Sequence, residues 1–84
     1  MSEALIDRLV IFAESGNQQK IVLKGQTHQG WIMEITDEAL LISTGYSEKV
    51  GKDNWIVFND LEHAELSYWD NHQDQWVLFH LKEN

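Results

Sequence analysis

Residues 19–44 read QKIVLKGQTHQGWIMEITDEALLIST, and this stretch decides the fold. Short runs of Ile, Val and Leu alternate with turn residues, which is typical of antiparallel strands. We expect strands over residues 19–24, 30–36 and 39–44, with turns at 25–27 and 37–38.

The second of these strands carries a conflict of periodicity. Alternation along a strand places Trp31, Met33 and Ile35 on one face and Ile32 and Glu34 on the other. Ile32 and Ile35 are nevertheless the residues best suited to burial. A β-bulge or a sharp bend between them brings both to the core. Because bent strands let a short sheet close on itself, we expect a small barrel.

An amphipathic helix is expected ahead of this stretch, over residues 2–15. Ser2 can cap its first turn, and Glu3 lies where the helix dipole favours an anion. Gly16 offers the left-handed residue that commonly ends helices. The apolar face consists of Leu5, Ile6, Leu9, Val10, Phe12 and Ala13.

Further short strands are expected on the C-terminal side. A long polar connection over residues 45–54 precedes them, and a tight turn at 59–60 and a polar turn at 70–75 separate them. The expected strands are residues 55–58, 64–69 and 76–81.

Four tryptophans are a high density for 84 residues. Trp55 begins a strand, and we expect it to be structural. Trp69 and Trp76 flank the polar turn and should face each other across a hairpin. For Trp31 and Trp69, packing and contact with a base or a protein partner are equally weighted alternatives.

The chain is strongly acidic, with fourteen Asp and Glu against six Lys and Arg, a net charge of −8 and a pI near 4.7. Net negative charge repels phosphate backbones, so the composition disfavours general nucleic-acid binding. The same surface suits a basic protein partner. Solubility alone is the alternative reason for such a charge.

Length and composition predict one small domain. A chain of 84 residues has room for one hydrophobic core, and the absence of cysteine removes disulfides and thiolate metal sites. No apolar run approaches the length of a membrane span, and the first fifteen residues do not read as a secretory signal. We therefore expect a cytoplasmic protein without a membrane partner.

Sequence motifs for chemistry are weak. The serines lie in no nucleophile motif, and no glycine-rich phosphate loop or calcium loop occurs. We therefore expect a non-enzyme with no cofactor and no metal. The weak acid–histidine clusters are Asp70, His72 and Asp74, and Glu62, His63 and Glu65.

The central stretch resembles the first motif of the Sm-like (LSm) small β-barrel proteins. In that motif a strand ends in Leu-Lys, a glycine follows, and a second glycine comes after four residues. Hydrophobic residues then stand two and five positions later. The resemblance covers about residues 4–44 and, more loosely, 55–66. The matching residues are Leu23, Lys24, Gly25, Gly30, Ile32 and Ile35.

The resemblance implies a mainly β fold: an N-terminal α-helix followed by a strongly bent, five- or six-stranded antiparallel barrel. Another small SH3-like barrel is the alternative. Residues 1–84 then form a single Sm-like domain, with the helix at about 2–15, the barrel at about 18–69 and an extra C-terminal strand at about 76–81.

Two departures from the Sm-like pattern concern its uridine pocket. An Asp and an Asn of the family are replaced by Thr36 and Leu40. The basic residue expected in a later turn is replaced by Asn59-Asp60, and the carboxylate of Asp60 repels phosphate. We therefore expect no such pocket. The candidate ligand or partner contacts are Trp31, Thr36, Asp37, Asn59, Asp60 and Trp69.

Sm-like barrels associate by pairing the fourth strand of one subunit with the fifth strand of the next. The run 55–58 is apolar at all four positions, and an uncovered edge of that kind invites aggregation. We therefore expect a ring or dimer of this chain. The alternative is a monomer whose C-terminal strand covers the edge. The candidate edge residues are Trp55, Ile56, Val57, Phe58, Ala64, Leu66 and Tyr68.

Two classes of function follow. The resemblance implies an oligomeric Sm-like binding module in RNA or DNA processing that lacks the usual uridine pocket. The competing class is an acidic protein-interaction module or inhibitor that binds a basic protein surface. The length and acidity are also similar to those of the Rho-binding antiterminator proteins, which use an Sm-like barrel and inhibit by binding a protein's RNA-binding surface.

Overall fold

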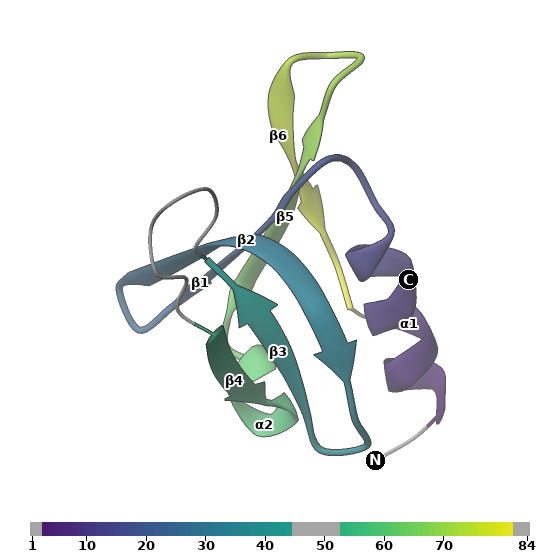
Figure 1. The fold of residues 1–84 in the computed structure, drawn as a ribbon, viewed down its shortest axis with the longest axis vertical. Helices are drawn as coiled ribbons and strands as arrows, with labels where there is room; N and C mark the ends of the chain where they lie inside the picture. Colours follow the sequence, from purple (N-terminus) through teal and green to yellow (C-terminus); the bar gives the residue numbers. More distant parts are fainter. Residues whose placement is uncertain (1–2, 45–52, 82–84) are drawn as a thin grey trace.

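Six antiparallel strands form one sheet in the order β4-β3-β2-β1-β5-β6, with helix α1 beside it (Figure 1). The computed structural model describes residues 3–44 and 53–81. The expected class, an N-terminal helix followed by antiparallel strands, is confirmed. The elements are α1 (Glu3–Ala13), β1 (Gln19–Leu23), β2 (Gln26–Ile35), β3 (Ala39–Ser43), β4 (Asp53–Val57), α2 (Phe58–Leu61), β5 (Glu65–Asp70) and β6 (Gln75–Phe79).

Helix α1 packs through the apolar face that its spacing predicts. Leu9 and Phe12 are fully buried. Val10, which was expected on the same face, is exposed, because it lies one helical step of about 100° away from Leu9. The helix ends at Ala13, and Gly16 has the predicted left-handed backbone, with a φ of 64°.

The first hairpin turns over two residues instead of the expected three. Leu23 pairs with Gln26, and Lys24 and Gly25 between them have φ values of 52° and 79°. Positive φ at both central residues is typical of a type I′ turn, whose twist matches that of the flanking strands. The prediction of a turn at 25–27 is therefore wrong, because β2 already begins at Gln26.

Strand β2 contains the predicted β-bulge. Its register against β3 shifts between Ile32 and Glu34, which leaves Met33 as the extra residue. The extra residue reverses the alternation of side chains. Ile32 and Ile35 consequently both pack against the hydrophobic core, although they have opposite parity in the sequence.

The core lies between α1, α2 and the inner face of the sheet. Residues from both helices and from all strands except β2 and β6 contribute fully buried apolar side chains to it. These are Leu9, Phe12, Ile21, Leu40, Ile42, Ile56, Phe58, Leu61 and Leu66.

One buried amide ties three elements together. The side chain of Gln19 on β1 is nearly inaccessible to solvent. Its Nε2 donates to the carbonyl of Ser15 at 2.7 Å, just after α1, and its Oε1 accepts the N–H of Ile32 on β2 at 3.3 Å. Because both ends of the amide are bonded, its burial carries little penalty.

Two expectations on the C-terminal half are corrected. The tight turn at 59–60 is the short helix α2, which begins at Phe58, a residue that was expected at the end of a strand. Strand β4 begins at Asp53, inside the expected polar connection over 45–54. The rest of that connection, residues 45–52, lies outside the described residues.

The sheet is not closed into the expected barrel, and β4 and β6 are its two edges. Strand β5 pairs with β1 on one side and along Leu66–Asp70 with β6 on the other. Both of its edges are therefore occupied within one chain. The expected pairing with β4 of a second subunit needs a free edge on β5, and neither edge of β5 is free.

The structure predicts opposite tolerance at two glycines. A Cβ at Gly30 collides with the backbone carbonyl oxygen of Ser43 on β3, whereas a Cβ at Gly25 meets nothing. We expect Gly30→Ala to lower the free energy of unfolding by about 3 kcal/mol. Gly25→Ala, which only strains a left-handed residue, should cost about 1 kcal/mol. Urea denaturation of the two variants measures the difference, and equal losses would contradict the close approach of β2 to β3.

Candidate functional site

Four of the predicted contact residues lie at one end of the sheet. Thr36 and Asp37 stand in the turn between β2 and β3, and Asn59 and Asp60 are in α2. The turn and the helix are adjacent, because the N–H of Phe58 donates to the carbonyl of Glu38 at 2.9 Å. The structure therefore brings these four residues to one region of the molecule.

The hydroxyl group of Thr36 is hydrogen-bonded within its own turn. Its Oγ1 accepts the N–H groups of Glu38 at 3.2 Å and Ala39 at 3.0 Å, and the N–H of Thr36 donates to the carbonyl of Ala39. This is the arrangement by which Ser and Thr stabilise tight turns. The hydroxyl therefore has a structural role, whereas the side chains of Asp37 and Asn59 are exposed.

Trp31 and Trp69 lie elsewhere, and each is hydrogen-bonded to the segment that joins α1 to β1. The Nε1 of Trp31 donates to the carbonyl of Asn17 at 3.1 Å, and the N–H of Asn17 donates to the carbonyl of Trp69 at 3.0 Å. Both indoles are half-buried. Trp69 also packs against Trp76 with ring centroids 5.5 Å apart and an interplanar angle of 73°, so the predicted cross-strand pair is confirmed.

Some of the candidate edge residues lie on the core side of the sheet, and others lie on its solvent side. Ile56, Phe58 and Leu66 are buried in the core, and Ala64 and Tyr68 are half-buried. Trp55 and Val57 are different, with exposed fractions of 54% and 48%. The expectation of a structural role for Trp55 is therefore wrong. Alternation along β4 turns its odd-numbered positions away from the core.

These two residues belong to an apolar surface that sequence reasoning missed. Trp55 lies opposite Leu41 on β3, and Leu41 lies opposite Glu34 on β2. Met33, the bulge residue beside Glu34, is 65% exposed. We call Met33, Leu41, Trp55 and Val57 the edge patch. No local signal predicted it, because its members come from three strands and meet only in the sheet.

The backbone of β4 is also open along this edge. In an antiparallel ladder, residues whose N–H and C=O groups face the partner strand alternate with residues whose groups face away. The hydrogen bond from the N–H of Phe58 to the carbonyl of Glu38 shows that the even-numbered residues of this segment bond toward β3. Ile56 therefore bonds toward β3, and the N–H groups of Trp55 and Val57 point away from the sheet.

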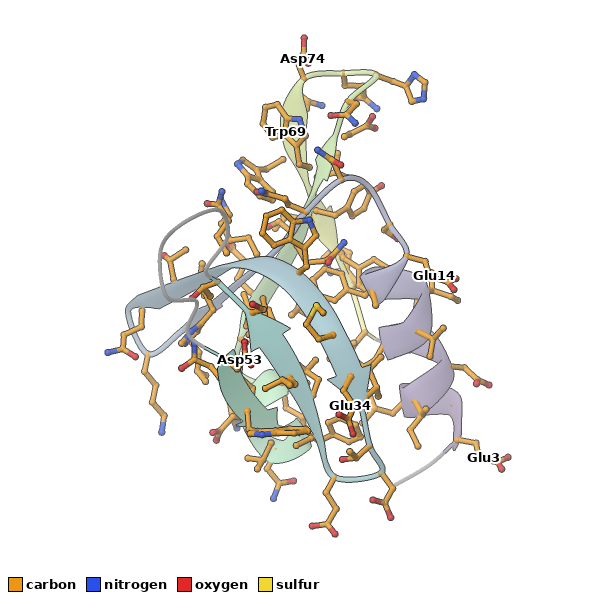
Figure 2. The ribbon with its side chains drawn as sticks, in the orientation of Figure 1. Glu3, Glu14, Glu34, Asp53, Trp69 and Asp74 are labelled. Atoms are coloured by element: carbon orange, nitrogen blue, oxygen red, sulfur yellow. The ribbon has the colours of Figure 1, made fainter. Side chains whose placement is uncertain are left out.

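The charge around the sheet is almost entirely negative. Residues 3–44 and 53–81 carry twelve Asp and Glu but only three Lys and Arg. Two of these bases lie over aromatic rings near β6: Arg8 is 4.5 Å from the ring centroid of Phe79, and Lys20 Nζ is 4.3 Å from that of Trp76. The third, Lys24, lies in the β1–β2 turn. Figure 2 shows Glu34 and Asp53 on either side of β3.

This arrangement offers exposed apolar and acidic surfaces for contact. Within the described parts of the chain, no three His, Cys, Asp or Glu side chains gather where a metal ion could bind. No helix of those parts is long and apolar enough to cross a bilayer. Comparisons with protein-family models, with curated proteins and with solved structures found no match.

The small number of Lys and Arg among the described residues predicts weak RNA binding. Thr36 is engaged in its turn, and Asp60 places a carboxylate where a phosphate contact was considered. We expect no tight binding of oligo-uridine at physiological salt, and any binding at low salt should fade steeply as ions are added. Fluorescence anisotropy of a labelled oligo-uridine measures this. Submicromolar affinity at about 0.15 M salt would contradict the prediction.

Proposed function

We propose that this chain is a non-enzymatic protein-interaction module that binds a basic protein surface. One observation carries the proposal: the described residues present twelve carboxylates against three cations. Opposite charge steers two proteins together and disfavours wrong partners. A basic surface is the partner that this charge distribution attracts most strongly.

The positions of the cations support a protein partner over a nucleic acid. Phosphate contacts come mainly from Lys and Arg side chains that are free to reach the backbone. Arg8 donates to the carbonyl of His80 and lies over Phe79, and Lys20 lies over Trp76. Lys24 is then the single described cation without an aromatic partner, and one cation gives little affinity for a polyanion.

We retain the Sm-like fold as part of the proposal, in a modified form. The N-terminal helix and the bulged second strand support it. The extra strand β6 pairs with the outer edge of β5 and so favours a monomer over a ring assembled through that edge. A bent sheet of this kind, without the uridine-pocket residues, is compatible with an inhibitor of a basic protein.

Purification of the tagged protein from its source cell tests the proposal. The expected result is a co-purifying basic protein, identified by mass spectrometry, with little absorbance at 260 nm. The purified partner should rebind, and its affinity should fall as salt rises, because exposed charges are screened. A bound nucleic acid, or a partner whose affinity does not change with salt, would show that the proposal is wrong.

Two charge-reversal variants sharpen this experiment. Glu34→Lys with Asp53→Lys changes the sheet face, and Glu3→Lys with Glu14→Lys makes the same change of charge at the first residue of α1 and just after its last (Figure 2). All four side chains are exposed, so folding should be preserved. Both variants should weaken the partner's binding. The larger loss, about tenfold, marks the face that the partner contacts.

A further inference from the structure

We propose that β4 accepts an extended basic segment of the partner as an additional strand of the sheet. This inference rests on the proposed function and names the surface and the form of the partner. It starts from the two properties of β4 described above: N–H groups at Trp55 and Val57 that point away from the sheet, toward no other described strand, and exposed apolar side chains at the same positions. A strand that adds to a sheet edge uses both, since main-chain bonds supply affinity and side chains supply specificity.

The order of side chains along β4 determines which residue types the added strand should have opposite them. Asp53, Trp55 and Val57 lie on one face, because they alternate along the strand. Apolar side chains of the incoming segment would lie against Trp55 and Val57, the two edge-patch residues on β4 itself. A Lys or Arg would lie opposite Asp53, where directly opposed charges of unlike sign stabilise a strand pair.

Charge distinguishes the two edges of the sheet. Both cations that lie over aromatic rings, Arg8 and Lys20, are beside β6, over Phe79 and Trp76. From Gln26 to Thr44 and from Asp53 to Leu81, the described chain has no Lys or Arg at all. Among the described residues, a basic segment along β4 therefore meets carboxylates such as Asp53, whereas along β6 it meets Arg8 and Lys20.

Charge also argues against a second copy of this chain as the occupant. Each copy carries a net charge of −8, so two copies repel each other. In an antiparallel pair of β4 strands centred on Trp55, each Asp53 would lie opposite the apolar Val57 of the other copy. That contact leaves both carboxylates without a cation, whereas a basic segment supplies one.

The test uses the full chain and a synthetic probe of about eight residues, in which one face has Val opposite Trp55 and Val57 and Lys opposite Asp53, and the remaining positions are Thr and Lys. The expected result is slower amide hydrogen exchange at Trp55 and Val57 when the probe binds. A matched probe, N-methylated at every second residue in each of the two phases, keeps the charge but cannot pair along its length. The N-methylated form in which the methyl groups replace the N–H groups that face β4 should bind at least about tenfold more weakly than the unmodified probe.

A pair of matched variants locates the edge. Val57→Lys and Leu78→Lys make the same substitution at exposed apolar positions, 48% and 54% accessible, on the two edge strands. Val57→Lys should weaken the probe about tenfold, because a lysine on an edge strand repels a basic strand, and Leu78→Lys should have little effect. Circular dichroism checks that both variants fold. If Val57→Lys does not fold, the N-methylated probe on the unaltered protein decides.

Three results would overturn the inference. The first is equal binding of the probe and both of its N-methylated forms, and the second is protection of β6 in place of β4. The third is protection of Trp55 and Val57 without any probe, together with a light-scattering mass twice 9.8 kDa, which would assign the edge to a second copy. The first two leave the proposed function standing, because a basic protein can still bind through charge. The opposite outcome is also distinguishable. If the probe protects β4 but no basic partner is recovered from cells, the edge site is supported and the proposed function is wrong.

Discussion

The bulge at Met33 is the constraint on which the rest of the sheet depends. One extra residue in β2 lets Ile32 and Ile35 face the core together, and it places Met33 outward at the surface. Without it, one of the two isoleucines would lie in water and β2 would run straight. The buried amide of Gln19 holds the bulged strand in place, because it bonds the N–H of Ile32 on one side and the end of α1 on the other.

The bend and the extra strand together give the sheet two unequal edges. At one edge, β6 carries Trp76 and Phe79, whose rings lie beside Lys20 and Arg8, so two of the three described cations lie there. At the other edge, β4 has exposed apolar side chains and no described cation near it. An asymmetry of this kind directs a basic partner to one side of the molecule.

Several residues considered for ligand contact serve the fold. The hydroxyl of Thr36 closes the turn between β2 and β3, and the indole N–H of Trp31 bonds the chain after α1. Trp69 is held between its hairpin partner and the same segment of chain. Of the candidate contacts, Asp37 and Asn59 remain exposed. The apolar surface around Trp55 and the carboxylate of Asp53 are also accessible to a partner.

The sequence by itself determined the features that depend on local periodicity: the helix face of Leu9 and Phe12, the bulge that reconciles Ile32 with Ile35, and the pairing of Trp69 with Trp76. Only the tertiary structure decided which strand lies beside β4 and β5. The sequence of the apolar run 55–58 does not show whether another strand covers its outer edge. The strands that could cover that edge come from distant parts of the chain. The long-range pairing of β1 with β5 occupies one edge of β5, and the β5–β6 hairpin occupies the other. Strand β4 is left at the edge of the sheet, with Trp55 exposed.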